Sequence, residues 1–274
     1  MTTLLSVDVE DWFQVENLKQ AISRESWDSN IPRVERNINL ILELLDQNST
    51  KATFFILGWI ARKYPSLVKK IHKEGHEIAS HGFEHDLIYN LTREKFKQDV
   101  SLTKNILEDL TGEEVIGYRA PSFSITEWAI EILMLLGYKY DSSLFPIVGH
   151  SRYGKLEKIV IPDKTIFELK KGFYQIMVSY IDVGKVKVPL AGGLYFRLIP
   201  YEIFKRGIKK IVQQKGHYIF YIHPWEFDPE QPKVNNIKLN YKLRHYSNLK
   251  MTEIKFKKLL NDFNFCRIRD AISV

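Results

Sequence analysis

Short apolar runs alternate along this chain with longer segments of helical periodicity, and this alternation limits the fold more than any other feature. The runs that predict buried strands lie at 4–9, 51–58, 76–80, 115–119 and 138–141. Helical patterns separate them at 32–45, 64–74, 92–112 and 126–136. Beyond residue 141 the pattern is looser, with predicted strands at 158–161, 166–169, 185–188, 217–222 and 266–268 and predicted helices at 200–214 and 251–263. Such alternation predicts an α/β fold, with a parallel sheet or barrel covered by helices.

The size and composition are those of one globular domain spanning residues 1–274. Hydrophobic residues make up 45% of the chain and charged residues 27%, and we find no repeat and no linker. The only cysteine, Cys266, excludes an internal disulfide. The segment Met1–Asp8 lacks the basic and apolar regions of a signal peptide, and no apolar run approaches the ~18 residues of a membrane span. We therefore expect a cytoplasmic protein that is not integral to a membrane.

The net charge of +7 does not by itself predict a nucleic-acid partner. The basic residues are scattered as short pairs, such as Lys69-Lys70 and Lys170-Lys171, and do not form one run. No nucleic-acid recognition motif accompanies them. We interpret them as a solvated surface and expect no nucleic acid among the partners.

Reactive side chains follow several of the predicted strands at the same relative position. They are Asp8, His81, Arg119, Asp141 and His223, each at or just beyond the carboxyl end of its predicted strand. In a barrel of parallel strands these ends form one face, and that face carries the active site. Each residue alone has an ordinary structural interpretation, but five on five strands favour a shared site.

The pair His81 and His85 indicates a metal site at this face. Neutral imidazole is the commonest side-chain ligand for metals, and a zinc-like ion needs a third ligand from elsewhere. Gly82 disfavours a helix through the pair, so the two histidines are expected at a strand end.

Five ordered motifs resemble those of the polysaccharide deacetylase family, also called the NodB homology domain or carbohydrate esterase family 4. The matching stretches are Ser6-Val7-Asp8-Val9-Glu10-Asp11, Ser80-His81-Gly82-Phe83-Glu84-His85, Tyr118-Arg119-Ala120-Pro121, Tyr140-Asp141-Ser142-Ser143-Leu144 and Tyr221-Ile222-His223-Pro224-Trp225. Three further stretches, at 8–13, 192–197 and 245–249, resemble the branch associated with exopolysaccharide biosynthesis. That branch carries a C-terminal extension of unknown function.

The resemblance implies a distorted (β/α) barrel of seven or eight strands. It places the catalytic motifs within residues 4–225 and a family-specific extension at about 226–274, packed on the barrel. It also implies a metal-dependent hydrolase that removes N-acetyl groups from an N-acetylated glycan or glycan precursor. The expected cofactor is a divalent metal, foremost Zn²⁺, with Co²⁺, Ni²⁺ or Mn²⁺ as alternatives. The oligomeric state is not predicted.

The family's first motif has two adjacent aspartates, a base and a metal ligand, whereas this chain has three acids. If Asp8 is the base, Glu10 or Asp11 is the ligand, and if Glu10 is the base, Asp11 is the ligand. We favour Asp8 as base and Asp11 as ligand, together with His81 and His85.

The other motifs imply the remaining roles. Arg119 pairs with the base, Asp141 orients His223, and His223 protonates the departing amine. Pro121 and Trp225 are expected to contact the sugar.

Two other classes of function compete with this one. The first is a metal-dependent amidohydrolase of the same fold that acts on a small cyclic amide or imide. The second is a catalytically silent glycan-binding protein, which would have no use for a full set of acid, base and ligands. Release of acetate from chitin oligosaccharides distinguishes all three.

Overall fold

The computed structural model describes residues 2–146, 153–154, 156, 161–184 and 186–272. Its main sheet has the strand order β10-β1-β2-β3-β4-β5-β7-β6, and β11 pairs with the start of β1. Every pair along this order is parallel except β7 and β6, which are antiparallel. The strands are β1 (Thr2–Val9), β2 (Thr53–Ile56), β3 (Glu77–Ser80), β4 (Gly117–Tyr118), β5 (Tyr140–Leu144), β6 (Ile166–Lys170), β7 (Phe173–Met177), β10 (His217–Ile222) and β11 (Phe265–Cys266). A separate hairpin pairs β8 (Tyr180–Val183) with β9 (Val186–Pro189).

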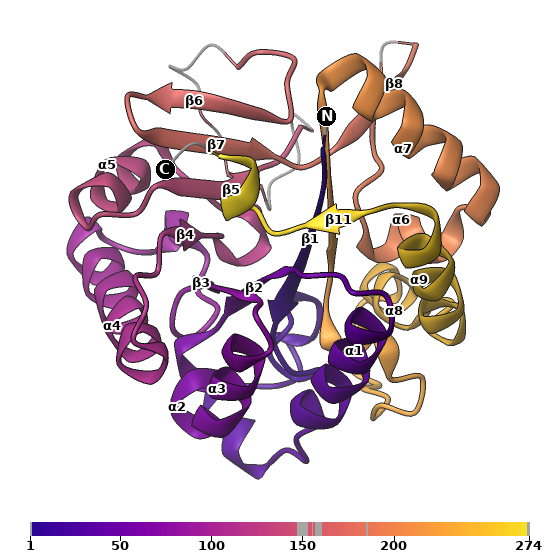
Figure 1. Ribbon diagram of the computed structural model, residues 1–274. Coiled ribbons are helices and arrows are strands. Elements are labelled where there is room, and N and C mark those ends of the chain that lie inside the picture. Colours follow the sequence, from indigo (N-terminus) through magenta and orange to yellow (C-terminus); the bar gives the residue numbers. More distant parts are fainter. Residues whose placement is uncertain (1, 147–152, 155, 157–160, 185, 273–274) are drawn as a thin grey trace.

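Helices lie around the outside of the curled sheet (Figure 1). The larger ones are α1 (Val34–Gln47), α3 (Pro65–Lys73), α4 (Arg93–Thr111), α5 (Glu127–Leu135), α7 (Tyr201–Lys215), α8 (Leu239–Tyr246) and α9 (Lys250–Asp262). Two short ones are α2 (Gly58–Lys63) and α6 (Gly193–Leu198). The fold is thus a curled eight-strand half-barrel of the α/β class, which confirms the predicted distorted barrel.

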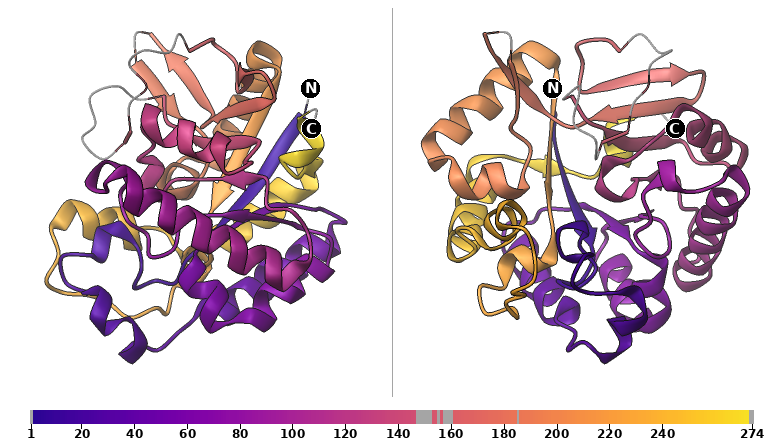
Figure 2. Two further views of the ribbon diagram at one scale, coloured as in Figure 1. Left: turned by 90° about the vertical axis from the view of Figure 1, so that its left-hand side faces the viewer. Right: turned by 180° about the vertical axis from the view of Figure 1, so that it is seen from behind.

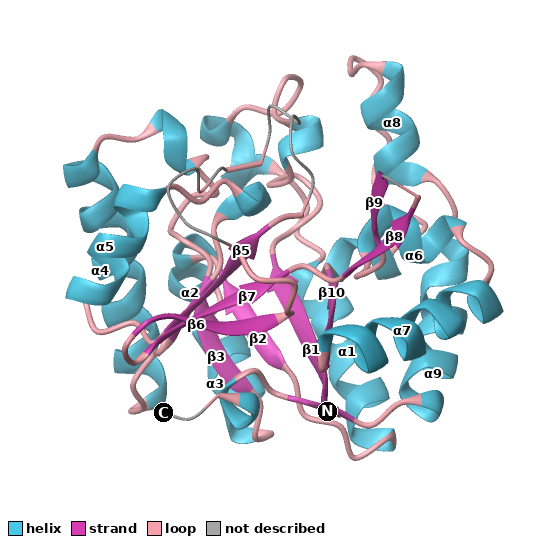
Figure 3. Ribbon diagram, turned by 90° about the horizontal axis from the view of Figure 1, so that it is seen from above, coloured by secondary structure: helices cyan, strands magenta, loops and turns pink. Residues whose placement is uncertain are grey.

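Residues of both chain ends meet at the start of β1. β1 pairs with β10, from the C-terminal half, and also with β11. The two views in Figure 2 show the first and last strands side by side. In Figure 3 both termini lie at one end of the molecule, and α8 lies at the other. Within the described residues no helix is both long and apolar enough to cross a membrane.

Alternation along the strands separates an outer core from an inner one. On β1, Leu5, Val7 and Val9 pack in the large cluster that includes the helices, whereas Leu4 belongs to a smaller cluster with Phe55. The smaller cluster collects inward-facing residues of several strands and Ile268 and Ile272 of the C-terminal tail. Successive side chains of a strand point to opposite faces. Ser6 and Asp8 therefore share the inner face with Leu4.

The sequence patterns predicted most of these elements within a few residues. They missed α2, β7, β8, α6 and α8, which are short or lack a clear period. The predicted strand at 158–161 falls largely outside the described residues, as does Lys185 of the strand predicted at 185–188. The helix at 93–111 begins and ends as its sequence indicated, because Thr92 accepts a hydrogen bond from the Lys95 amide and Gly112 has a φ of 71°.

Candidate active site

Strand alternation directs four of the predicted residues to the inside of the half-barrel. Asp8 lies near the end of β1, and His81, Arg119 and His223 directly follow β3, β4 and β10. His81 lies two residues after Ala79, which belongs to the inner cluster, so both side chains point to the same face. Arg119 directly follows Tyr118, which belongs to the outer cluster, so its side chain points to the inner face. The structure therefore brings these side chains together at the carboxyl ends of the strands.

Glu10, His81 and His85 form a group with the donor atoms of a metal site. One ligand atom from each lies within 4.8 Å of the others, and all three residues are buried. The Oε2 atom of Glu10 is 2.9 Å from His85 Nε2, so the carboxylate and this imidazole are already in direct contact. His81 Nδ1 lies 2.8 Å from the Arg119 carbonyl oxygen. That carbonyl can only accept, so Nδ1 carries the proton and the other ring nitrogen is free to bind a metal.

The electrostatics of this group also fit a cation. Burial lowers the pKa of His81 to about 4, so its imidazole is neutral, as a ligand must be. Burial opposes the charge of Glu10, but the neighbouring imidazoles of His85, His223 and His81 lower its pKa to about 2. Two imidazoles and one carboxylate, all buried, are a donor set that suits a zinc-like ion.

Our expectation that Asp11 is the third ligand does not fit this geometry. Its Oδ2 atom accepts hydrogen bonds from the amides of Arg33 and Val34, and Oδ1 accepts one from the Trp12 amide. Two of these amides stand at the start of α1, where a helix leaves donors unpaired and favours negative charge. The Asp11 carboxylate thus binds the amides at the start of α1, and Glu10 is the acid that lies with the two histidines in the candidate metal site.

Asp8 and Arg119 form a buried ion pair beside this group. Arg119 Nη1 bonds to Asp8 Oδ1 and donates to Ser6 Oγ, and the rest of the guanidinium donates to Ser142. The guanidinium carbon also lies 4.1 Å from the centre of the Phe55 ring. The expected pairing of Arg119 with Asp8 is present in this geometry.

His223 has a different partner from the one we expected. Its Nδ1 is 2.9 Å from Glu226 Oε1, while its Nε2 is 3.5 Å from Glu10 Oε1 and 3.9 Å from Asp8 Oδ2. Burial opposes a charged imidazole, but the bond to Glu226 and the charge of Glu10 raise the pKa of His223 to about 9. A carboxylate does orient His223, and that carboxylate is Glu226.

Asp141 does not contact His223, which corrects the role we assigned to it. It is the second residue of β5, and its carboxylate accepts hydrogen bonds from Ser143 and from Gln175 Nε2. Tyr140 faces the inner cluster, so strand alternation turns Asp141 to the other face. Burial raises the pKa of Asp141 to about 6.

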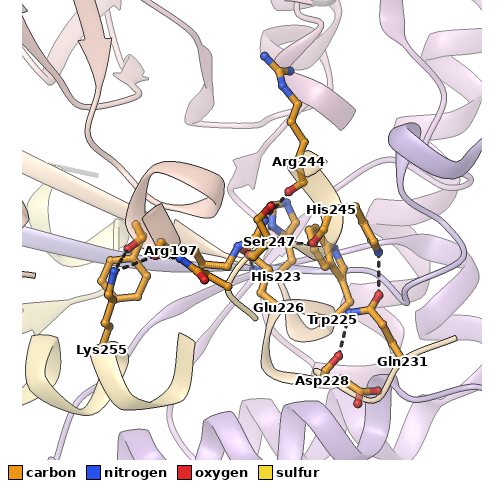
Figure 4. Close-up of polar contacts among 12 residues, drawn as sticks. Arg197, His223, Trp225, Glu226, Asp228, Gln231, Arg244, His245, Ser247 and Lys255 are labelled. Carbon is orange, nitrogen blue, oxygen red and sulfur yellow. Dashed lines mark hydrogen bonds and ion pairs between the residues drawn. The ribbon is translucent and has the colours of Figure 1, made fainter. Parts of the chain in front are cut away.

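Glu226 is held in turn by Arg197, the last residue of the stretch at 192–197. Arg197 Nε is 2.8 Å from Glu226 Oε2, and both side chains are fully buried. Figure 4 shows this pair between His223 and the carbonyl groups of the chain around His245. Two signals could have indicated the arrangement: an acid three residues after His223, and an arginine that closes the motif at 192–197.

A cavity of about 150 Å³ opens onto these groups. Asp8, Glu10, His81, His85 and His223 are among the residues that line it. Its lining also includes the aromatic residues Phe123, Phe145, Tyr153, Tyr195 and Tyr221, together with charged ones such as Glu16 and Arg244. A concave site that combines aromatic surface with a few reactive polar groups is the usual form of a small-molecule subsite.

The two predicted sugar contacts differ in position. Pro121 is not among the described residues that line the cavity, and its neighbours Ser122 and Phe123 are. Both neighbours have a left-handed backbone, with φ of 50° and 58°, which turns the chain toward the cavity there. Trp225 does line it, but its ring lies between His223 and His245 and its Nε1 donates to Glu10 Oε1 at 3.2 Å. Trp225 also packs in a hydrophobic cluster with Trp12, Phe13 and Leu249.

Known protein families match both halves of the chain. Residues 26–140 match the polysaccharide deacetylase family, and residues 142–273 match a domain of unknown function (DUF3473). The peptidoglycan-N-acetylglucosamine deacetylase of Bacillus cereus is 29% identical over 131 residues, which cover 42% of this chain and 48% of that protein. The chitooligosaccharide deacetylase of Azorhizobium caulinodans is 31% identical over 94 residues, 34% of this chain and 43% of that protein. The chain thus spans less than half the length of these curated relatives.

Solved structures share the fold along nearly the whole chain. A polysaccharide deacetylase described as putative, from Mycobacterium smegmatis, has a TM-score of 0.62 at 16% identity, covering 98% of this chain and 88% of that one. A CE4 family pseudoenzyme from Bacillus anthracis has a TM-score of 0.53 at 14% identity, covering 98% and 64%. These solved structures show that the fold is shared, and the family models show that the chain carries a polysaccharide deacetylase domain, matched over residues 26–140, followed by a domain of unknown function, matched over residues 142–273.

Proposed function

We propose that this protein is a metal-dependent carbohydrate N-deacetylase. In the proposed reaction, water cleaves the amide of an N-acetylated amino sugar and yields acetate and a free amine. The observation that carries the proposal is the group of Glu10, His81 and His85 beside Asp8 and His223, all of which line one cavity. The deacetylases among its relatives act on peptidoglycan and chitooligosaccharides, which supports a glycan as substrate.

Glu10, His81 and His85 are the residues that would hold the metal, foremost Zn²⁺. When bound there, such an ion polarises the acetyl carbonyl and lowers the pKa of a bound water. Three protein ligands are the number that catalytic zinc sites use, and with such a set a further position would remain for water or substrate. The three buried donor atoms, all within 4.8 Å of one another, give this ligand set its physical support.

The chain's own residues would move the protons. Asp8, held by Arg119, takes a proton from the attacking water. His223 presents Nε2 on the cavity side and donates a proton to the amine nitrogen as the carbon–nitrogen bond breaks. The aromatic residues that line the cavity would pack against the sugar.

The glycan we propose is an exopolysaccharide or its precursor. Support comes from the stretches at 192–197 and 245–249, which resemble the exopolysaccharide branch and which meet in space through Arg197 and His245. Purified protein tested on chitin oligosaccharides and on peptidoglycan fragments gives the first measure of this preference.

Acetate release by the purified protein tests the proposal. Chelation should abolish release, and added Zn²⁺ should restore it. His81→Ala should lose bound metal and activity together, whereas His223→Ala should retain metal and lose turnover by ~10²-fold or more. Acetate release that survives His81→Ala would contradict the metal site. A protein that binds Zn²⁺ and glycan yet releases no acetate would be a silent binding protein.

A further inference from the structure

Glu226 is a buried carboxylate that lies between His223 and Arg197. It is fully buried, with a relative exposure of 0%. Its Oε1 is 2.9 Å from His223 Nδ1 and also accepts the His223 backbone amide at 3.2 Å. Its Oε2 faces Arg197 Nε at 2.8 Å. A single carboxylate thus joins the reactive histidine to a buried arginine (Figure 4).

This contact determines which nitrogen of His223 faces the reaction. An ionised carboxylate only accepts hydrogen bonds, so Nδ1 carries a proton whether the ring is neutral or charged. Arg197 lowers the pKa of Glu226 although burial opposes its charge, so the carboxylate is ionised. Nε2 is then the nitrogen that exchanges its proton, and it is the one near Asp8 and Glu10. Trp225, stacked on His223 at 5.2 Å and 26°, restricts the tilt of the ring.

Arg197 is itself anchored by the end of α8. Its Nη2 donates to the Arg244 carbonyl at 2.7 Å, and its Nη1 donates to the carbonyls of His245 and Ser247 at 3.0 and 2.5 Å. The last carbonyls of a helix lack partners within the helix and carry partial negative charge, so a guanidinium satisfies and stabilises them. The position of Arg197 is therefore set by a segment about fifty residues further along the chain.

Lys255 of α9 holds the backbone of α6, the helix that carries Arg197. Its ammonium donates to the carbonyls of Phe196, Arg197 and Ile199 at the end of α6, at 2.8 to 3.1 Å. Both helices that hold Arg197 belong to residues 142–273, and Glu226 belongs to the same part of the chain. That part is the domain of unknown function.

We propose that Glu226 and Arg197 are positioning residues for His223, and that the C-terminal domain of unknown function serves to complete the active site. The domain supplies the carboxylate that orients the general acid, the arginine that holds the carboxylate, and the helix ends that hold the arginine. This inference rests on the proposed function only in taking His223 as the proton donor to the departing amine.

The test compares a substrate that needs a proton donor with one that does not. An amine leaves from an amide only when its nitrogen is protonated, whereas 4-nitrophenolate leaves from 4-nitrophenyl acetate as a stable anion. Glu226→Gln keeps the size of the side chain and removes its charge. We expect the variant's kcat on chitin oligosaccharides to fall ~10²-fold with KM nearly unchanged, and its esterase kcat to stay within ~3-fold of wild type. Bound metal should equal that of the wild type.

Glu77→Gln is the matched control. Glu77 is equally buried, and its carboxylate accepts hydrogen bonds from Thr53, Tyr140 and the Arg269 amide at the opposite end of the half-barrel. Its loss should lower stability and leave the ratio of amide to ester turnover unchanged. An equal fall of both activities in Glu226→Gln, or no fall on the amide, would overturn the positioning role.

The double variant His223→Ala/Glu226→Gln tests whether Glu226 acts through His223. If it does, the second substitution has no further effect on amide turnover in the His223→Ala background. Additive losses would contradict the proposal. Arg197→Lys, which keeps the charge and loses the planar fork, should shift the amide-to-ester ratio in the same direction as Glu226→Gln.

A readout without turnover separates this inference from the proposed function. The His223 Nδ1 proton, observed by NMR in the wild-type protein, should move upfield in Glu226→Gln, because a neutral amide oxygen is a weaker acceptor than a carboxylate. It should not move in Glu77→Gln. If no amide is hydrolysed by the wild type but this shift occurs, the proposed function fails and the positioning contact stands. If the signal does not change, the positioning contact fails.

Discussion

Three carboxylates within four positions of the chain have three different surroundings. Asp8 pairs with Arg119, Glu10 faces two histidines, and Asp11 accepts three backbone hydrogen bonds. Their side chains are chemically alike, so their roles follow from which donors lie opposite each one. At the scale of the residue, the role of each acid therefore depends on the direction in which its side chain points.

This difference predicts opposite results for two isosteric substitutions. Glu10→Gln should weaken binding of Zn²⁺ at least ~10-fold with little loss of stability, because it removes a charged ligand. Asp11→Asn should keep the metal and lower the free energy of unfolding by ~1–3 kcal/mol, because backbone donors lose an acceptor. Titration calorimetry with Zn²⁺ and denaturant unfolding measure the two effects. Loss of metal in Asp11→Asn alone would reverse the assignment.

His76 predicts how stability depends on pH away from the site. It is buried at the turn before β3, and its Nδ1 accepts a hydrogen bond from the Ala52 amide at 3.2 Å. Burial lowers the pKa of His76 to about 4 from an ordinary 6.5. The folded state therefore holds the neutral ring, while the unfolded state takes up a proton below pH 6.5. Its contribution to stability is complete above pH 6.5 and is lost as the pH falls toward 4.

We expect His76→Gln to flatten this part of the pH profile. Between pH 7 and 4 the wild type should lose up to ~3 kcal/mol more unfolding free energy than the variant. Denaturant unfolding of both proteins at several pH values measures the difference. Parallel profiles would show that His76 does not account for the acid sensitivity.

At the scale of elements, the start of α6 depends on a close approach between the backbone of Gly192 and that of Tyr221 in β10. Gly192 forms a parallel bridge to Tyr221, and the Tyr221 amide donates to the Ala191 carbonyl at 2.7 Å. A Cβ on Gly192 would lie 1.8 Å from the Tyr221 carbonyl oxygen. Gly192 also has a φ of 149°, a conformation that other residues rarely adopt. Only glycine lets α6 start here and carry Arg197 to Glu226.

A pair of glycine substitutions isolates this close approach. Gly192→Ala should lower the free energy of unfolding by ~3 kcal/mol or more, because it adds a steric clash to backbone strain. Gly172→Ala, at a φ of 76° with nothing within 4 Å, should cost only ~1 kcal/mol of strain. Denaturant unfolding compares them, and equal losses would mean that backbone conformation alone explains Gly192.

At the scale of the whole molecule, the two family regions share one core. β10 completes the sheet beside β1, and Phe227, Phe256, Leu259, Leu260 and Phe265 all lie in the main hydrophobic cluster. Ile268 and Ile272 close the inner cluster at the start of the strands. The C-terminal segment therefore contributes to the interior as well as to the site.

A truncated chain ending at residue 226 tests this dependence. Each large buried side chain contributes ~1.5–3 kcal/mol, so losing five removes about as much as the ~5–15 kcal/mol that stabilises a typical domain. We expect the truncated chain to lack a cooperative thermal transition, and the full chain to unfold in one. A stable, cooperative 1–226 fragment would show that the extension is an independent unit.

The sequence alone determined the architecture and where on it the chemistry lies. Apolar runs and helical periods predict an α/β barrel because burial of one face is a local, periodic requirement. His81, Arg119 and His223 could be placed at strand ends for the same reason, since their positions follow from where each apolar run stops.

Only the tertiary structure decided which polar groups meet. Asp11 binds amides 22 and 23 residues away, Arg197 binds carbonyls 47 to 50 residues away, and Asp141 lies on the other face of its strand from Tyr140. A hydrogen bond depends on distance and angle between groups that local periodicity does not relate. The sequence therefore located the site, and the packing of α1, α6 and α8 distributed the roles within it.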